Sequence, residues 1–271
     1  MKQKNLNSGK KSNKFISIVT PNLNGDKFLE KTLVSVCNQT DQDFEYIVID
    51  GKSTDQSKNI INKYINRIDV FISEKDKSMY HAIDKAIKKS CGEVIIWINS
   101  DDLLHQDAVL NIKKIFKYNK EINWITGRNG YIKKDFQFSG IPYVYPRVIL
   151  QNKLARHDMW GFLQQESISF RKAMYMQAKG FDYRFQNACD FDLWTRFCKL
   201  AGSPTPVSIK IGYFRTSSEQ NSKVFKKQYF RNVGVKFDRI SFRFARFFVS
   251  LICYPLIVLR TYFLLKKHKS L

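Results

Sequence analysis

Several features that define other classes of protein are missing from this 271-residue sequence. It has no C-x-x-C pair, and its cysteine count of five is odd. That usage fits neither a disulfide framework nor a zinc site, and it favours a reducing cytoplasm. The N-terminal stretch MKQKNLNSGKKSNK is lysine-rich and lacks an apolar core. We therefore expect residues 1–14 to form a disordered basic tail and not a secretory signal.

Two nucleotide-binding loops are also absent. The chain contains neither G-x-G-x-x-G, the loop of dinucleotide-binding domains, nor G-x-x-x-x-G-K-[ST], the phosphate loop of P-loop NTPases. Both loops present phosphates to backbone N–H groups at a helix N-terminus. Their absence argues against dinucleotide-dependent dehydrogenases and P-loop NTPases.

Acidic residues are scarce relative to basic ones. The chain has 46 Lys and Arg against 24 Asp and Glu, which gives a formal net charge of +22. Such a charge attracts nucleic acid, anionic lipid or phosphorylated small molecules. It is concentrated here in the two tails, whereas nucleic-acid binding calls for a basic stripe across the folded domain. We therefore expect no nucleic-acid partner.

From Phe15 onward, short apolar runs alternate with helical patterns. We expect strands at 15–20, 45–50, 70–74 and 93–99, and helices at 27–39, 56–65, 78–90 and 107–118. This alternation predicts an α/β fold with a mostly parallel, doubly wound sheet. In such sheets, ligands bind at the carboxyl ends of the strands.

The second half of the chain is less regular. We expect strands at 124–132, 136–144, 165–171 and 209–215, the first two joined by a turn, and a helix that begins near Asp190. After Ser222 the composition becomes basic and aromatic. The sequence therefore predicts one folded domain over residues 15–222 and a separate tail over residues 223–271.

Asp101 and Asp102 directly follow an apolar strand. Carboxylates are hard ligands that suit Mg²⁺ or Mn²⁺, and these cations usually share their coordination with substrate phosphates. A metal in that place neutralises charge that builds on a diphosphate leaving group. The plainer alternative is a helix cap beside a solvated acid, because Asp favours helix starts without any metal.

Polar residues follow two other predicted strands. Asp50 ends the second strand in the sequence DGKSTD, where it can accept hydrogen bonds from a base or ribose. Gly51 permits a tight turn into a helix N-terminus that favours anions. An ordinary capped turn is the alternative. A cluster after the third strand either contacts a ligand or forms a polar loop: Glu74, Asp76, Tyr80 and His81.

Asp190 and Asp192 lie at the start of a predicted helix, DFDLWTRF. An acid at a helix start that faces a cleft can act as a general base. For Asp192, a helix cap with an ion pair to Arg196 is the stronger interpretation.

In this order, seven segments resemble the motifs of family 2 glycosyltransferases with the GT-A fold: FISIVTPNLNGDKFLEKTLVSVCNQT, YIVIDGKSTDQS, SEKDKSMYHAIDKAI, GEVIIWINSDD, QQESISFRK, GFDYRFQNACDFDLWTRF and GYFRTSSEQNS. Each motif alone is weak, but seven in the family's order over residues 15–222 are specific. The resemblance implies a GT-A fold, a nucleotide-sugar donor and a divalent metal, Mn²⁺ or Mg²⁺.

The resemblance also implies roles for single positions. Asp190 falls on the position of the catalytic base, and Asp101 and Asp102 stand at the metal and ribose motif. Asp50 would bind the base, typically uracil, and Arg215 would lie near the diphosphate. The positions implied around the nucleotide-sugar and the sugar or acceptor cleft are Thr20, Pro21, Asn24, Asp50, Ser53, Asp76, Tyr80, Asp101, Gln165, Glu166 and Arg215.

Some positions depart from the family's common pattern. Asn99 stands where many members have the first Asp of an Asp-x-Asp set, and Ser217 stands where many have a His. Both changes bear on the ligand set of the metal. The replacements that bear on the identity of the donor sugar are Ser78, His81, Asp84 and Ala86, where Gly, Asp, Asn and Gly are usual.

The tail over residues 223–271 carries 12 Lys or Arg and one acid, Asp238. Its longest uncharged run, 247–259, has about 13 residues and is interrupted by Pro255, whereas a spanning helix needs roughly 20 residues. This pattern favours an amphipathic segment in the interface of an anionic membrane. A helix packed on the domain and a tilted span over 244–265 are the alternatives. No Q-x-x-R-W motif of processive family members occurs, which favours single addition.

We therefore predict an inverting, metal-dependent glycosyltransferase. The expected reaction moves a sugar from a nucleotide-diphosphate sugar, a UDP-sugar in the first place, to a glycan or lipid-linked glycan acceptor. The expected setting is surface polysaccharide or lipopolysaccharide synthesis, peripheral on the inner face of the cytoplasmic membrane. A nucleotidyltransferase, the other alternative, needs a basic, Gly-rich phosphate loop near the first strand, and the segment PNLNGDKF offers little of that. The retained Asp50, Asp101, Asp102 and Asp190 argue against a non-catalytic nucleotide-binding relative.

Overall fold

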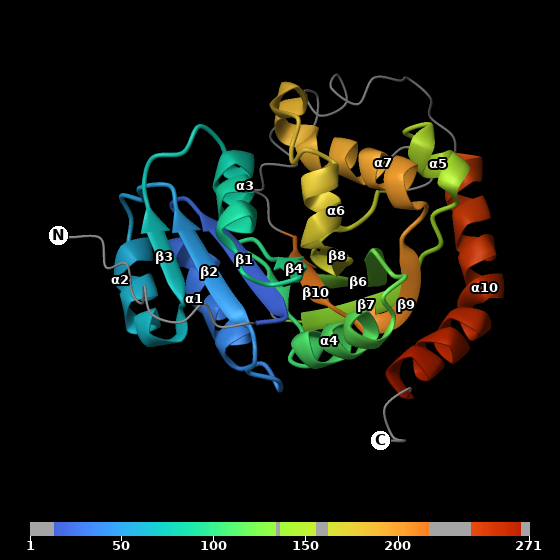
Figure 1. The fold of residues 1–271 in the computed structure, drawn as a ribbon, viewed down its shortest axis with the longest axis horizontal. Helices are drawn as coiled ribbons and strands as arrows, with labels where there is room; N and C mark the ends of the chain where they lie inside the picture. Colours follow the sequence, from blue (N-terminus) through green and yellow to red (C-terminus); the bar gives the residue numbers. More distant parts are fainter. Residues whose placement is uncertain (1–13, 134–135, 156–161, 217–239, 267–271) are drawn as a thin grey trace.

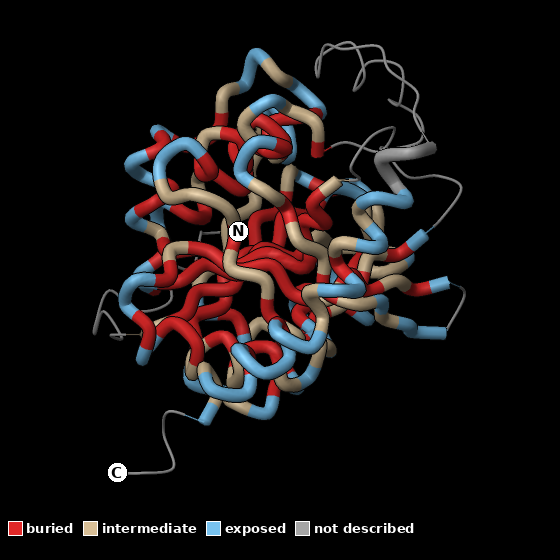
Figure 2. The backbone as a smooth tube through the Cα atoms, turned by 90° about the vertical axis from the view of Figure 1, so that its right-hand side faces the viewer, coloured by how far each residue is buried: buried red, intermediate tan, exposed pale blue. Residues whose placement is uncertain are grey.

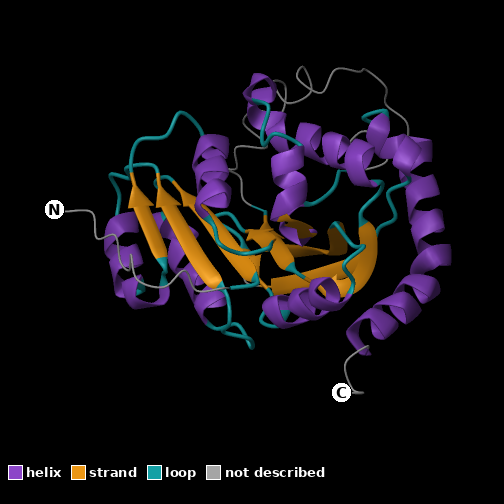
Figure 3. Ribbon diagram, viewed as in Figure 1, coloured by secondary structure: helices purple, strands orange, loops and turns teal. Residues whose placement is uncertain are grey.

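A single mixed sheet runs through the computed structural model, which describes residues 14–133, 136–155, 162–216 and 240–266 (Figures 1 and 3). Its strand order is β3-β2-β1-β4-β8-β6-β10-β5, with β7 and β9 also paired to β6. The strands are β1 (Ile16–Asn22), β2 (Glu45–Asp50), β3 (Val70–Ser73), β4 (Val94–Trp97), β5 (Leu103–Leu104), β6 (Trp124–Lys133), β7 (Phe136–Pro142), β8 (Ile168–Arg171), β9 (Thr205–Lys210) and β10 (Gly212–Arg215).

Helices cover both faces of this sheet (Figure 3). The α-helices are α1 (Asp26–Cys37), α2 (Ser57–Lys63), α3 (Met79–Lys89), α4 (Ala108–Tyr118), α5 (Arg147–Gln151), α6 (Lys172–Gln177), α7 (Cys189–Ala201) and α10 (Ile240–Lys266). Short 3-10 helices are η1 (Ile65–Arg67), η2 (Gln165–Ser167) and η3 (Tyr183–Ala188).

Strands β3, β2, β1 and β4 form a parallel half of the sheet, as the alternating pattern predicts. The register pairs Asn22 with Asp50, and Asp50 with Ser73. Because parallel strands end at the same edge, the polar residues at these three ends lie side by side. This half of the sheet confirms the prediction of a doubly wound α/β fold.

The other half is mixed. Strand β8 lies antiparallel between β4 and β6, and β6 and β7 form the predicted antiparallel pair. Two expectations are wrong in detail here. Residues 165–167 form η2 and not strand, and the strand expected over 209–215 is divided into β9 and β10. At the break, the carbonyl of Ile211 accepts a hydrogen bond from the His105 N–H at 2.8 Å, which draws the chain towards β5.

Alternate strand residues feed two cores, one on each face of the sheet. The strands in the middle of the molecule are mostly buried (Figure 2). Ile18 and Val48 point to the core under α1, α2 and α4. Val19 and Ile47, one position away, point to the core under α3, α6 and α7. Side chains of neighbouring strand residues point to opposite faces, so strands buried on both faces read as continuous apolar runs.

Helix α10 stands at the edge of the molecule beside β9 (Figure 1). It is continuous from Ile240 to Lys266, so Pro255 does not interrupt it as the sequence suggested. A proline removes one N–H from a helix, and contacts with β7 and β9 hold α10 against the domain. By length and composition, Phe244–Lys266 suffices to cross a membrane. The predicted N-terminal tail, except Lys14, and residues 223–239 lie outside the described residues.

Candidate active site

Asp50, fully buried at the end of β2, accepts hydrogen bonds on both carboxylate oxygens. Oδ1 accepts from Asn22 Nδ2 at 3.0 Å and from Ser53 Oγ. Oδ2 accepts from the Ser53 N–H at 3.1 Å and from Ser73 Oγ at 2.8 Å. A carboxylate offers about four acceptor sites, so protein donors occupy this one, and a ligand's donor would have to replace one of them.

The loop after β1 is tied to the turn after β2. The Asn24 N–H donates to Ser53 Oγ at 2.8 Å, and Asn24 Oδ1 accepts from the Thr54 N–H at 2.9 Å. Asn24 has a φ of 50°, a left-handed conformation that Asn tolerates better than most residues. Thr20 and Pro21 are buried in β1, where Thr20 Oγ1 accepts from the Tyr46 hydroxyl at 3.2 Å. The predicted positions 20, 21, 24, 50 and 53 thus belong to one corner.

Asp102 and Glu166 form a second polar group, with Asn99 between them. Both carboxyl groups are buried, and Asn99 Nδ2 lies 3.3 Å from Asp102 Oδ2 and 3.5 Å from Glu166 Oε1. The same Nδ2 donates to Gln165 Oε1 at 3.1 Å. Trp97 Nε1–H donates to Asn99 Oδ1 at 2.8 Å, so the amide nitrogen faces the acids.

The acids of this group repel one another. Burial raises the pKa of Asp102 well above its usual range, and the charges of Glu166 and Asp101 raise it further. Burial raises the pKa of Glu166 to about 7, and the charges of Asp101 and Asp190 act in the same direction. Burial also raises the pKa of Asp101, which the nearby Arg215 opposes. Asp101, Asp102, Glu166 and Asp190, called the acid cluster below, therefore share one field.

Arg215, at the end of β10, closes the acidic pair from the other side. Its backbone N–H donates to Asp102 Oδ1 at 2.8 Å, and its Nε donates to the backbone carbonyl of Asp101 at 2.7 Å. The guanidinium lies 4.4 Å from the centre of the Phe28 ring. A buried positive charge is thus fixed beside Asp101 and Asp102.

Asp190 begins α7 as predicted, and Tyr80 from α3 holds it. The Tyr80 hydroxyl donates to Asp190 Oδ1 at 3.0 Å, and the Tyr80 ring packs against Trp97 and Phe181. Burial raises the pKa of Asp190, against the hydrogen bonds that the carboxylate accepts. A raised pKa brings a carboxylate closer to the range in which it takes a proton at neutral pH.

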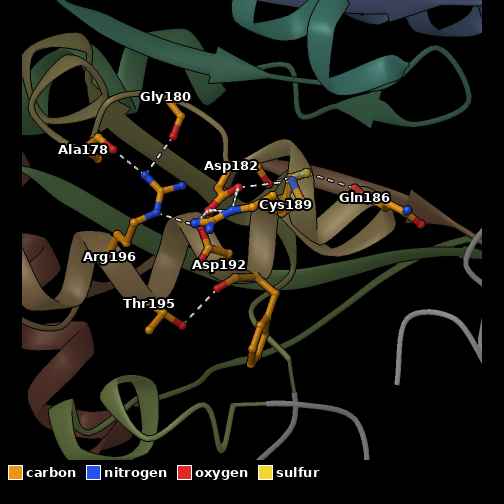
Figure 4. Close-up of polar contacts among 10 residues, drawn as sticks. Ala178, Gly180, Asp182, Gln186, Cys189, Asp192, Thr195 and Arg196 are labelled. Atoms are coloured by element: carbon orange, nitrogen blue, oxygen red, sulfur yellow. Dashed lines mark hydrogen bonds and ion pairs between the residues drawn. The ribbon is translucent and has the colours of Figure 1, made fainter. Parts of the chain in front are cut away.

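Arg196 fastens the start of α7 (Figure 4). Its Nε donates to Asp192 Oδ2 at 2.7 Å, which confirms the ion pair expected for these two residues. Its Nη1 donates to the carbonyls of Ala178 and of Gly180, the latter at 2.8 Å. The loop before η3 is therefore bound to α7 through Arg196, six residues after Asp190.

Asp76 lies apart from both groups, in the loop before α3. Lys85 Nζ donates to Asp76 Oδ1 at 2.7 Å, whereas Asp76 Oδ2 is buried without a hydrogen-bond partner among the described residues. His81 stacks on Tyr183 at a ring distance of 3.8 Å. These residues belong to an open groove of about 400 Å³, lined by Lys75, Asp76, Lys77, His81, Asp84, Lys85, Lys88 and Tyr183.

The structure thus divides the predicted residues between the corner around Asp50, the acid cluster with Arg215, and the groove at Asp76. Sequence reasoning did not single out Asn22, Ser73 or Trp97, which orient Asp50 and Asn99. The register of parallel strands was a usable signal for the first two, because residues that end adjacent strands are neighbours.

The acid cluster has the chemistry that a divalent cation requires. Its carboxylate oxygens are hard ligands, and a bound cation would offset the repulsion that raises their pKa values. In the part of the chain that the structure describes, however, no group of three or more His, Cys, Asp and Glu side chains is arranged to hold a metal ion. Asp101 and Asp102 can therefore supply only part of the ligand set of a divalent cation, and a substrate would supply the rest. Ser217 lies outside the described residues.

Solved structures define the fold class. The chain aligns with Staphylococcus aureus TarS 1–349 in complex with UDP-GlcNAc at a TM-score of 0.60 and 14% identity, over 93% of this chain and 70% of that one. It aligns with the mannosyltransferase PcManGT of Pyrobaculum calidifontis, in complex with GDP-Man and Mn²⁺, at 0.58 and 14% identity, over 95% and 76%. The fold is the GT-A fold predicted from the sequence.

Sequence comparison then gives the family. The model of glycosyl transferase family 2 matches residues 17–175, and the chain belongs to that family. It is 25% identical to a chondroitin synthase of Escherichia coli over 238 residues, 84% of this chain and 33% of that protein. It is 34% identical to the poly(ribitol-phosphate) beta-N-acetylglucosaminyltransferase TarP of Staphylococcus aureus (strain N315) over 116 residues, 41% and 34%. The match spans about a third of the length of both relatives.

Proposed function

We propose that this protein is an inverting glycosyltransferase that uses a UDP-sugar. The acceptor is a glycan or lipid-linked glycan in the synthesis of surface polysaccharide or lipopolysaccharide. The observation that carries the proposal is the gathering of the acid cluster beside the Arg215 guanidinium at the carboxyl edge of the sheet. Relatives named for chondroitin, poly(ribitol-phosphate) and teichuronic acid support the class of product.

On the donor side, the corner around Asp50 receives the base and Arg215 faces the diphosphate. Arg215 offsets negative charge as the sugar departs, because its guanidinium is fixed and cannot lose its proton. The complex of TarS with UDP-GlcNAc supports a uridine donor, since the chain shares that fold.

On the acceptor side, Asp190 is the general base. Its carboxylate takes the proton of an acceptor hydroxyl, and the hydroxyl oxygen attacks the anomeric carbon on the face opposite the leaving diphosphate. The bond to the diphosphate oxygen breaks with inversion. Tyr80 orients the carboxylate through its hydrogen bond at 3.0 Å. Gln165 and Glu166 line the cleft between donor and acceptor.

Mn²⁺ or Mg²⁺ is the cofactor that we propose for Asp101 and Asp102. When bound, such an ion supplies charge neutralisation for the leaving diphosphate. The Mn²⁺ in the PcManGT complex supports this choice. Asn99 and Trp97 hold the Asp102 side chain in place, and Arg215 keeps the adjacent backbone fixed.

We also propose that the protein is peripheral on the inner face of the cytoplasmic membrane and docks through residues 223–271. The free cysteines among the described residues agree with a reducing compartment. The apolar helix α10 supplies the contact with lipid. A membrane-docked enzyme is well placed to meet a lipid-linked acceptor.

A thermal-shift titration with UDP, GDP, CDP, dTDP and ADP, each with and without Mn²⁺, tests the donor site. A ligand that binds only the folded protein raises its unfolding temperature. We expect a shift for UDP that requires Mn²⁺ and is lost in Asp102→Ala. A shift of equal size in Asp102→Ala would show that Asp102 does not hold the metal.

Asp190→Asn tests the base. We expect donor affinity and unfolding temperature to stay as in the wild type while turnover falls roughly a thousandfold, since a positioned base contributes about 10²- to 10⁴-fold. Asp192→Asn, two residues away and paired with Arg196, is the matched control for charge at this helix start. Full turnover in folded Asp190→Asn would show that another group takes the proton.

A further inference from the structure

Helix α10 carries most of its large apolar side chains on the side that faces away from the domain. Ile252 is 74% exposed, Leu256 68% and Phe263 60%. At about 100° per residue, the exposed apolar side chains from Phe244 to Phe263 cover roughly half of the helix circumference. Only 17% of its apolar window is buried inside the structure. Contiguous exposed apolar surface of this length marks an interaction site.

The opposite side of α10 faces the domain, with Ile257 buried there, and three hydroxyls bond it to the domain. Ser250 Oγ accepts from the Val144 N–H at 3.3 Å, the Tyr254 hydroxyl accepts from Arg128 Nη2 at 2.9 Å, and Thr261 Oγ1 accepts from the Ser208 N–H at 2.8 Å. The spacing of residues 250, 254 and 261 places all three on one helix face. This inner seam joins α10 to β6, to β9 and to the segment after β7.

A surface helix in a soluble domain turns its apolar stripe to the core. In α10, Ile257 and the seam hydroxyls face the domain, but most of the large Leu, Ile and Phe side chains face outward. The outer face has no charged side chain between Phe247 and Leu259, whereas exposed Arg260 and Lys266 follow it. The uncharged outer face suits the hydrocarbon of a membrane, and the basic residues that follow it suit lipid phosphates.

We propose that α10 is a monotopic anchor that lies flat in one leaflet, with its outer face in the hydrocarbon and its inner seam still bonded to the domain. The proposal deepens the membrane docking proposed above by naming the geometry of the contact. A helix that crossed the bilayer would carry the seam hydroxyls and their partners into hydrocarbon or break their bonds. Unpaired polar groups are costly there, so spanning structures satisfy them internally.

An anchor of this kind also sets the orientation of the domain. The seam extends over 12 residues from Ser250 to Thr261, a rise of about 16 Å along the helix, and it bonds to three separate segments of the domain. The helix runs along the side of the domain from the level of α5 to that of α4 (Figure 1). The domain therefore cannot rotate about a flexible linker at this contact, and the carboxyl edge of the sheet keeps a fixed orientation relative to the membrane.

Cysteine labelling of the full chain in bacterial spheroplasts tests the geometry. Exposed Cys91 reports the side of the domain, and a cysteine appended after Leu271 reports the end of the helix. The two reporters are placed in separate proteins: one keeps Cys91, and the other has Cys91 replaced and carries the appended cysteine. Both proteins also carry Cys253→Ser. We expect a membrane-impermeant maleimide to react with either reporter only after lysis. Reaction of the appended cysteine in intact spheroplasts, with Cys91 still protected, would show a crossing and overturn the proposal.

Sedimentation with vesicles tests the outer face. We expect Leu256→Glu to lower the fraction bound to vesicles of phosphatidylcholine and phosphatidylglycerol by roughly tenfold or more, because it places a charge in hydrocarbon. Leu200→Glu, at an exposed leucine of α7, is the matched control and keeps binding. A wild-type protein that stays in the supernatant as a dimer would overturn the proposal in favour of a second copy as the occupant.

The two proposals fail separately. Leu256→Glu keeps the nucleotide-dependent thermal shift, because Leu256 is far along the chain from every residue of the acid cluster and lies on the outer face. Loss of vesicle binding with that shift intact supports the anchor. A wild-type protein that binds vesicles but no nucleotide would contradict the proposed transferase and leave the anchor standing.

Discussion

Two carboxylate sites at the same edge of the sheet are built in opposite ways. Asp50 is surrounded by hydrogen-bond donors from three segments, which occupy both of its oxygens. Asp102 is packed against Glu166 and Asp101, whose charges raise its pKa. The first site is complete without a ligand, whereas the second holds more negative charge than the protein balances. A ligand's donor at Asp50 must therefore replace one of the protein's own, whereas a cation at Asp102 would offset charge that the protein leaves unbalanced.

Asp102→Asn gives the largest effect that this comparison predicts. We expect turnover to fall roughly 10²- to 10³-fold, the range seen when one electrostatic group of an active site is removed. We expect the metal-free protein to become more stable, because one of several mutually repelling charges is gone. Released nucleotide measures the first effect, and urea unfolding without metal measures the second. Destabilisation would mean that Asp102, like Asp50, is balanced by the protein.

The stability of the protein should also change with pH, in a way that depends on the acid cluster. Burial raises the pKa of Glu166 from 4.5 to about 7, so the folded protein binds this proton more tightly than the unfolded chain. The free energy of unfolding of the metal-free protein should therefore rise as pH falls from about 7 to 4.5, by up to about 3 kcal/mol. Unfolding at a series of pH values measures it. Glu166→Gln should flatten this part of the curve, and a wild-type curve already flat would contradict the shift.

Asp50→Ala should act in the opposite direction to Asp102→Asn. It leaves the donors of Asn22, Ser53 and Ser73 without their acceptor, so we expect a loss of about 2–3 kcal/mol in the free energy of unfolding. Thermal and urea unfolding measure the loss. The control is Asp182→Ala, which removes an ion pair with Arg184, whose side chain is 88% exposed, and should change stability by under about 1 kcal/mol. Equal effects in both variants would remove the distinction drawn for Asp50.

Ser73→Ala is the smallest change in this set. It removes one of the donors to Asp50 Oδ2 and leaves the others in place. We expect a loss of about 1 kcal/mol, the usual net contribution of one hydrogen bond. It also frees an acceptor site on Asp50. Titration with UDP would therefore show whether a ligand's donor takes the place of the Ser73 hydroxyl.

The parallel half of the fold follows closely from the sequence. Strand β2 was predicted over 45–50 and is found there, because the apolar run EYIVID is bounded by Gly51. The division between β9 and β10 was not predictable, since IKIGYFR continues the strand pattern through the break. What divides it is the His105 N–H and the pairing with β5, both distant in the chain. The short helices α5 and α6 were missed because five or six residues are too few to show a repeating helical pattern.

For the candidate site, local signals were sufficient and long-range ones were not. Asp192 and Arg196 are four residues apart, so their ion pair could be predicted from spacing alone. The acids at strand ends followed from the parallel sheet. The closeness of Glu166 to Asp102 depends on β8 entering between β4 and β6 antiparallel to both. No periodicity in the sequence reports that insertion, which is why Glu166 was expected only near the sugar or acceptor.

The bond between Thr261 and the Ser208 N–H has a practical consequence for anyone preparing this enzyme. Strand β9 pairs with β6 on one side, and α10 covers Ser208 on the other. A chain truncated before Ile240 to remove the apolar helix α10 would expose that edge of β9 to solvent. Open strand edges template aggregation, so the shortened protein should precipitate sooner than the full chain kept in mild detergent.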